Sequence, residues 1–277
     1  MELPERKVVL EITTGNGTKT IHDGLNVQFN ITTSTNAIGG EANIMIANLP
    51  MDEIINTTTL LSSFENVKKR KKIRLSAGYG DDIGVIFQGD VVHAEPISEP
   101  PDIWLQIEAR IGYFDNTKVI THTIQNKTSI KDIAQQAANW LGLSLNWMSK
   151  ANKMINSFHI SGSANQVIQK LNDLGDIFAY SDSEKLNIID SLNPNIGITS
   201  TLSKSSGMIG IPKIDNNAVR VTMLLNHSLK LGQTISIKSD LIPEVNGDYW
   251  IFALTHSGAL RETEFYTTAC CRRKNGK

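Results

Sequence analysis

The sequence predicts a mainly β protein in which a small α/β region lies between two antiparallel β regions. Three observations support this fold class. Apolar residues alternate with other residues through much of 1–118, two helical patterns with capping residues occur within 119–192, and alternation returns within 193–277. Alternation at every second residue is typical of a strand with one buried face, whereas apolar residues three or four apart indicate a helix. We therefore expect three domains with these boundaries, packed as one rigid body.

The first region has the pattern of a small β-barrel or β-sandwich with one helix inserted. Its alternating segments are Val8 to Ile12, Leu25 to Ile31, Ala42 to Ile46, Ile73 to Ala77, Val85 to Val91 and Ile103 to Ala109. Asn16-Gly17 is a strong hairpin signal, and Pro100-Pro101 interrupts the pattern before the last segment. The apolar residues between 51 and 64 fit a helical face better than an alternating one, so a short helix is expected there.

Each helical pattern in the middle region begins with a capping residue. Ser129 with Asp132 precedes the first pattern, which ends at Gly142, and Ser163 with Gln166 precedes the second. Such pairs satisfy the free N–H groups at a helix start, and glycine commonly ends a helix. Strand-like runs follow at residues 143–147, 177–180 and 186–189. Residues 119–192 are therefore predicted to form a small α/β domain.

The last region returns to alternation. Its expected strands contain Val219 to Met223, Ile235 to Ile237, Tyr249 to His256 and Thr263 to Cys271. Asn246-Gly247 predicts a type I′ hairpin turn before the third of these strands. Ser257-Gly258 predicts a turn before the fourth. Residues 193–277 are therefore predicted to form a second antiparallel β domain.

The composition argues against several classes of protein. The chain has 277 residues with 27 Lys and Arg against 28 Asp and Glu, which gives a formal net charge of -1. A dedicated nucleic-acid binder is usually strongly basic, so this balance favours protein partners. No apolar run approaches the roughly 18 residues that a membrane span needs, and the N-terminus lacks the pattern of a signal peptide. We expect a cytoplasm-like compartment during synthesis.

The two cysteines are neighbours, Cys270 and Cys271. Adjacent side chains on a strand point to opposite faces, so a disulfide between them would strain the backbone. We expect two reduced thiols, one packed and one facing out, with a metal or redox pair as the alternative.

No motif for catalysis or for a bound group stands out. Residues 15–20, GNGTKT, lack the spacing of a phosphate-binding loop, and no G-x-S-x-G elbow occurs. The six histidines are scattered singly, without the spacing of a helical metal site. The acidic pairs Asp81-Asp82 and Glu262 with Glu264 are more typical of solvated turns. We therefore expect no enzyme activity, no catalytic residue, no cofactor and no metal.

One dense charge run stands out, namely Lys68, Lys69, Arg70, Lys71 and Lys72. The run could meet nucleic acid or an acidic patch on a partner protein. It could equally be a solvated junction between a helix and a strand. We carry it forward as a candidate protein–protein interface, because five like charges repel one another unless some are paired.

Three groups of segments, taken together, resemble a known protein family. They are IMIANLP at 44–50 with KKIRLSAGYGDDIGVIFQGDVV at 71–92; TSIKDIAQQAANWLGL at 128–143 with GSANQVIQKLNDLG at 162–175 and KLNIID at 185–190; and GMIGIPKI at 207–214 with LKLGQTISIKS at 229–239 and NGDYWIFALTHSG at 246–258. In order and spacing they resemble the baseplate hub proteins of contractile-tailed phages. The tube-like domains of that family are shared with the spike proteins of contractile secretion systems.

The resemblance implies a structural virion protein in the tail baseplate, assembled in the host cytoplasm. It implies a homotrimer in which the two β domains are tube-like antiparallel β-barrels flanking the α/β domain. Such a ring would join the sixfold tail tube to the threefold spike and provide a channel for DNA in transit. The implied partners are further copies of the chain, the tail tube protein, the spike protein and the surrounding baseplate proteins.

Two placements follow for the ring. We expect the basic run at 68–72 to contact another subunit or a neighbouring baseplate protein, because a strongly basic channel wall would retain DNA. We expect residues 119–192 to lie outside the ring. Spike and lytic modules would then be separate chains.

Two other function classes stay open. A peptidoglycan-binding or peptidoglycan-degrading tail protein would need a cleft with close carboxylates. A carbohydrate-binding β protein would need exposed aromatic side chains. Trp104, Trp140, Trp147 and Trp250 lie in periodic apolar patterns, which favours core packing for each of them.

Overall fold

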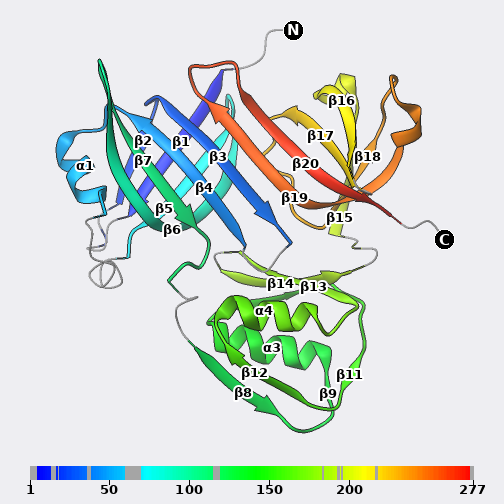
Figure 1. Ribbon diagram of the computed structural model, residues 1–277. Coiled ribbons are helices and arrows are strands. Elements are labelled where there is room, and N and C mark those ends of the chain that lie inside the picture. The colour runs from blue at the N-terminus through cyan, green and yellow to red at the C-terminus, as the bar shows by residue number, and fades with distance from the viewer. Residues whose placement is uncertain are drawn as a thin grey trace.

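The computed structural model shows a mainly β protein with a helical region on one side (Figure 1). It describes residues 5–13, 17, 19–35, 39–59, 70–114, 119–182, 184–191, 194, 196–215 and 218–274. A sheet of thirteen strands dominates the fold, and its main path runs in the order β16-β17-β20-β19-β3-β4-β7-β6-β5-β1-β2. Within the described residues, none of the helices is long and apolar enough to cross a membrane.

The first region supplies seven strands and one helix. They are β1 (Arg6–Thr13), β2 (Lys19–Asp23), β3 (Val27–Ser34), β4 (Gly40–Ala47), α1 (Met51–Thr57), β5 (Lys72–Tyr79), β6 (Asp82–Glu99) and β7 (Asp102–Arg110). Each of the six expected alternating segments overlaps a strand. In β1 every second side chain is buried, with Val8, Leu10 and Ile12 at most 1% exposed. The predicted hairpin partner of β1 is confirmed, since β2 pairs with it in antiparallel register.

The helix expected near 51–64 is shorter than predicted. α1 ends at Thr57, because Thr58 is extended with φ −53° and ψ 134°. Residues 60–64 of the expected helix lie outside the described residues. Thr57, Thr58 and Thr59 are all β-branched, which disfavours continuation of a short helix.

The strand β6 is longer than the sequence pattern indicated. Its first half pairs with β5 and its second half, from Asp90, pairs with β7. Gly89 lies at this transition, where a Cβ atom would come within 2.8 Å of the Arg110 carbonyl oxygen. The glycine therefore allows a close backbone approach at this position.

The last region supplies six strands and two short 3₁₀ turns. They are β15 (Ile196–Leu202), η2 (Lys204–Ser206), β16 (Met208–Asp215), β17 (Ala218–Leu224), β18 (Gln233–Ile237), η3 (Pro243–Val245), β19 (Gly247–Ala259) and β20 (Phe265–Arg273). All their pairings are antiparallel except that of β15 with β18, which is parallel.

Two expected turns in this region were wrong. Asn246 has φ −66° and ψ 138°, whereas a type I′ turn needs a positive φ there. Its side-chain amide instead bonds the backbone of Ser239, with Oδ1 2.6 Å from the amide nitrogen. Ser257-Gly258 lies inside β19, and the chain reverses between Ala259 and Phe265.

The two β regions are joined edge to edge. Strand β19 pairs with β20 along one edge and with β3 along the other, in antiparallel register from Ala253 opposite Ser34 to Ala259 opposite Gln28. Figure 1 shows the blue β3 lying beside the orange β19. Through the strands that the structure describes, the pairings run from β16 to β2 as an open path and do not close into a barrel.

The middle region packs two helices between small sheets. Its elements are β8 (Ile120–Ile124), β9 (Thr128–Ser129), α3 (Ile130–Leu141), β10 (Ser144–Trp147), β11 (Met154–Ile155), β12 (Phe158–Gly162), α4 (Ala164–Asn172), β13 (Ile177–Ser181) and β14 (Lys185–Asp190). The sheet β10-β14-β13 lies on the side of the β regions, and β8 and β12 lie on the far side of the helices (Figure 1).

Both predicted helix starts are confirmed. The Ser129 hydroxyl accepts a hydrogen bond from the Asp132 amide, and Gly142 ends α3 in the left-handed conformation with φ 70°. Ser163 and Gln166 form a complete capping box at α4. The strands β8, β9, β11 and β12 were not predicted, because each has five residues or fewer, too few for an alternating pattern to be distinctive.

Three clusters of buried side chains correspond to the three regions. The largest joins β1 and the strands β3 to β7 and includes Phe265 from β20, the second lies among the last strands, and the third joins α3 and α4 to their sheets. Trp104 and Trp250 are buried, as expected, whereas Trp140 and Trp147 are half-buried against the third cluster.

Candidate assembly interface

The basic run is partly occupied by contacts inside the chain. Lys68 and Lys69 lie outside the described residues. The Arg70 guanidinium lies 5.3 Å from the centre of the Phe114 ring. Lys71 Nζ donates to the carbonyl oxygens of Thr57 and Thr58, at 2.9 and 2.8 Å. Lys72 is exposed at the start of β5.

Two of the five cations, Arg70 and Lys71, therefore make contacts within the chain. The carbonyl groups at the end of a helix lack partners within it and carry partial negative charge, so a lysine is stabilising there. Lys71 thus completes the end of α1. The role of the run as a protein interface stays a prediction.

The long sheet ends in strands with open edges. At one end lies β16, which pairs only with β17 among the described strands. Its side chains Ile211 and Ile214 are 51% and 65% exposed. At the other end lies β2, with Ile21 60% exposed. An open edge with exposed apolar side chains is a template for pairing with another chain.

A third open edge lies on the second half of β6. From Asp90 onward this half pairs with β7, and the pairing of β5 with β6 ends at Asp90. Thr59 covers Ala94 by two hydrogen bonds with its backbone. From Glu95 to Glu99 no described strand pairs with the free side, and both glutamates are exposed. This edge was not predicted, because Pro100-Pro101 was interpreted as a break in the pattern, although proline is typical of edge strands.

Two contacts hold the turn regions of the two β regions together. Arg6 of β1 donates to the carbonyl oxygens of Ala259, Glu262 and Thr263, and its guanidinium lies 5.2 Å from the centre of the Phe265 ring. These contacts fix the reversal between β19 and β20 against the first region.

A second contact joins the loop after β17 to the start of β6. His227 Nε2 lies 2.9 Å from the Asp82 carboxylate. The ring lies against the backbone of Gly84, where a Cβ atom would come within 2.2 Å of its Nδ1. Gly84 therefore leaves the space that this histidine occupies.

The other histidines have partners of their own. His22 lies 2.8 Å from Glu53, His93 lies 3.5 Å from Glu95, and His122 stacks on Trp140 with ring centres 4.2 Å apart. His159 and His256 bond Thr123 and Thr267. No group of three or more candidate metal ligands occurs in the part of the chain that the structure describes.

The cysteines lie on opposite faces of β20, as predicted. Cys271 is buried in the second cluster, and Cys270 is half-buried. Burial raises the pKa of the Cys271 thiol well above its ordinary value, and the neighbouring Cys270 adds to this effect. A thiol held in its neutral form is a poor nucleophile and a poor metal ligand.

The fold is similar to those of solved tail and secretion proteins at low sequence identity. The 43 kDa tail protein of prophage MuSo2 from Shewanella oneidensis matches with a TM-score of 0.67 and 11% identity, over 98% of this chain and 99% of that chain. A tail protein from Neisseria meningitidis MC58 matches with a TM-score of 0.64 and 10% identity, over 96% of each chain. The E. coli c3393 protein, a component of the type VI secretion system, matches with a TM-score of 0.63 and 10% identity, over 91% of this chain and 74% of that chain.

Sequence comparison assigns the family. No curated protein matches this sequence. The sequence model of the family described as baseplate hub gp41 matches residues 6–271. This match spans almost the whole chain and agrees with the resemblance of its sequence motifs. The chain therefore belongs to the baseplate hub gp41 family and is a structural protein of the phage tail baseplate.

Proposed function

We propose that the chain forms a homotrimeric ring that joins the sixfold tail tube to the threefold spike and leaves a channel for DNA. The observation that supports this proposal is the pairing of β3 with β19, which places the two β regions side by side in one sheet. Three chains would then present six β regions around one axis. In this proposal residues 1–118 and 193–277 are the tube-like domains, completing barrel-like closure only in the assembly, and residues 119–192 are a separate domain.

The open edges suggest how neighbouring chains meet. A ring needs a heterologous contact, in which one edge of a subunit meets a different edge of the next. We assign this contact to β16 of one chain and the free side of β6, residues 95–99, of the next. β16 carries the exposed Lys213, and β6 carries the exposed Glu95 and Glu99. Opposite charges across paired strands stabilise the pairing.

The α/β region supports the outward placement that the ring requires. It joins the β regions through the sheet β10-β14-β13, and its helices and the β8–β12 pair extend away from the long sheet (Figure 1). In this position it would contact surrounding baseplate proteins. The basic run at 68–72 would contact another subunit or a neighbouring baseplate protein.

Likenesses of fold support the choice of partners. The E. coli c3393 protein is described as structurally similar to the T4 tail proteins gp27 and gp5. A Francisella chain in a PdpA–VgrG complex matches with a TM-score of 0.56 and 9% identity, over 99% of this chain and 60% of that chain. We propose the tail tube protein and a spike protein as partners, an adaptor role without catalysis, and assembly in the host cytoplasm.

The experiment measures native mass. The wild-type chain is expected as a trimer, and a negative-stain image should show a ring with a central hole. The double variant Ile211→Glu, Lys213→Glu places acidic side chains on β16 and is expected to leave monomers, because it repels the acidic edge of β6. Ile55→Glu on α1, where Ile55 is 68% exposed, is the matched control and should stay trimeric.

A charge reversal tests the pairing itself. Adding Glu95→Lys and Glu99→Lys to the double variant is expected to restore the trimer, whereas these two changes alone should weaken it. A wild-type monomer or dimer would contradict the ring. If the variants at all four positions remain as stable a trimer as the wild-type chain, the assignment of the contact to β16 and β6 is wrong, although the ring itself is not contradicted.

A further inference from the structure

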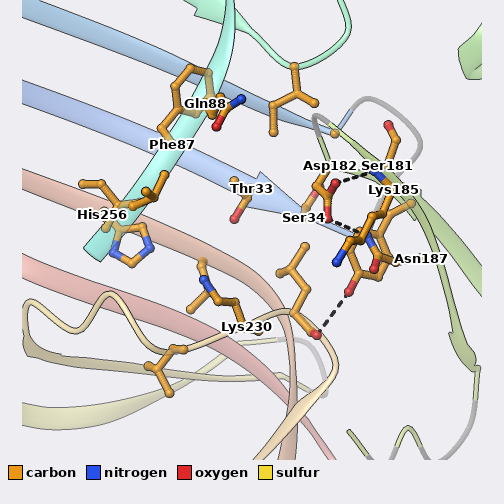
Figure 2. Close-up of a pocket in the computed structure, with 18 of the residues that line it drawn as sticks. Thr33, Ser34, Phe87, Gln88, Ser181, Asp182, Lys185, Asn187, Lys230 and His256 are labelled. Carbon is orange, nitrogen blue, oxygen red and sulfur yellow. Dashed lines mark hydrogen bonds between the residues drawn. The ribbon is translucent and has the colours of Figure 1, made fainter. Parts of the chain in front are cut away.

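A cavity of about 510 Å³ lies where the three regions of the chain meet. Figure 2 shows residues from all three regions around it. Thr33 and Phe87 come from the first region, Asp182 and Asn187 from the middle region, and His256 from the last. Cavities of roughly 300–1,000 Å³ with a few converging polar groups are typical of ligand sites.

One wall of the cavity holds a buried histidine with a free ring nitrogen. His256 is 3% exposed, and its Nδ1 lies 2.9 Å from the hydroxyl oxygen of Thr267. That oxygen already accepts a hydrogen bond from the Asn226 amide. Thr267 is fully buried, so its hydroxyl proton needs an acceptor, and Nδ1 of His256 is the one within reach.

The tautomer of His256 follows from this contact. Because Nδ1 accepts, the ring proton of neutral His256 lies on Nε2. Within the described residues Nε2 has no hydrogen-bond partner, although the side chain lines the cavity. Nε2 is not among the fully buried polar atoms without a partner, so it keeps some accessible surface and can donate to an acceptor that enters the cavity.

The charges around the cavity favour an anion. Lys185, Lys230 and Asp182 are the charged side chains of its lining, which leaves an excess of positive charge. The Asp182 carboxylate already accepts from the backbone N–H groups of Glu184 and Lys185 and from Asn187 Nδ2. Lys230 Nζ has one weak contact, at 3.4 Å to the His227 carbonyl oxygen. Within the described residues, neither lysine forms an ion pair with a carboxylate.

Apolar side chains complete the lining. Phe87, Leu229 and Leu254 are buried there, and Met148 lies on the side of the middle region. Apolar walls beside a donor and a cation would accommodate a carboxylate on a hydrocarbon stem, whereas they disfavour a fully hydrated inorganic anion. Lys185 and Lys230 are exposed, so the cavity is reached from the surface beside them.

We propose that this cavity binds an acidic side chain, flanked by apolar residues, on an extended segment of another protein. The carboxylate would accept from His256 Nε2 and pair with Lys230, and the flanking residues would contact Phe87 and Leu254. We choose an acidic partner because the cavity lining has an excess of positive charge. The proposal does not depend on the ring, since the whole cavity is formed within one chain.

The test uses the full chain labelled with ¹⁵N-histidine and two acetylated, amidated peptides, Leu-Glu-Leu and Leu-Gln-Leu. The glutamate peptide is expected to shift the Nε2 resonance of His256 and to bind at least tenfold more tightly than the glutamine peptide. Equal binding of the two, or a His256 signal that does not move, would overturn the proposal. If hexanoate binds as tightly as the glutamate peptide, the proposal that the ligand is a protein segment is wrong.

Variants assign the roles of Lys230 and His256. Lys230→Met is expected to weaken the glutamate peptide at least tenfold, and Lys238→Met, a change at an exposed lysine outside the lining, should leave binding unchanged. His256→Gln retains an N–H donor and should keep more affinity than His256→Leu. Circular dichroism shows whether each variant is folded, and a folded Lys230→Met chain with unchanged affinity would contradict the assignment.

Discussion

Several individual side chains in this protein hold backbone segments in place. Lys71 completes the end of α1, Arg6 fixes the reversal between β19 and β20, and Asn246 bonds the backbone of Ser239. Each of these contacts joins residues that are distant in sequence or belong to different elements. Such contacts have no signature in the sequence, because the same residue types occur on any solvated surface.

The burial of His256 predicts a dependence of stability on pH. Desolvation lowers the pKa of His256 to about 4, and the charges of Lys230 and His227 add to the effect. In the unfolded chain the ordinary pKa is about 6.5, so between pH 6.5 and 4 the unfolded state binds a proton that the folded state does not. The contribution of His256 is fully present above pH 6.5 and is lost as the pH falls toward 4, by roughly 3 kcal/mol in total.

Urea unfolding at pH 7.5, 6 and 5 measures this dependence. His256→Gln has no ionisable group at this position, so the variant should show a flatter profile than the wild-type chain. Parallel profiles for the two proteins would show that His256 does not carry the effect.

At the scale of elements, the capped helices were the most predictable part of the fold. The start of α4 depends on residues within a few positions of one another, so local sequence specifies it. Ser163 accepts from the Gln166 amide, and Gln166 Oε1 accepts from the Ser163 amide at 2.7 Å. Gly162 leaves room for this, since a Cβ atom there would come within 2.2 Å of Gln166 Oε1.

Removing this cap should destabilise the middle region. Ser163→Ala leaves the Gln166 amide at the start of α4 without its acceptor and is expected to lower the free energy of unfolding by about 1 kcal/mol. Ser157→Ala, at an exposed serine outside the helices, is the matched control and should change it by less than about 0.5 kcal/mol. Equal effects of the two changes, measured by urea unfolding, would refute the role of the cap.

Longer-range features were less predictable. The alternation in β1, β3, β4 and β17 correctly indicated strands, because a half-buried strand repeats every second residue. Alternation does not specify the partner of a strand, so neither the pairing of β3 with β19 nor the parallel pair of β15 and β18 followed from it. Alternation likewise does not show which strands lie at the edges of the sheet, since an edge is defined by a neighbour that is absent.

At the scale of the whole molecule, the long sheet is a single connected structure. The largest buried cluster contains Phe265 from β20 together with side chains of β1 and of β3 to β7, so the two β regions share apolar contacts as well as the pairing of β3 with β19. A shared core of this kind favours cooperative unfolding.

Native-state hydrogen exchange tests this cooperativity. The amides that β3 and β19 share are expected to exchange with the same opening free energy as those between β3 and β4. A clearly smaller opening free energy for the β3–β19 amides would show that the two β regions separate before either one unfolds. Amides between β8 and β12, which have a core of their own, serve as the internal comparison.

The pairing of β3 with β19 also constrains the order of events during synthesis. The partners are roughly 220 residues apart in the chain, and contacts so distant form late. While the ribosome is still making the middle of the protein, β3 presents an unpaired edge that invites association with other nascent chains. The nascent chain can cover this edge with its own sequence only after β19 has left the ribosomal exit tunnel, so a strand translated roughly 220 residues later protects the earlier one.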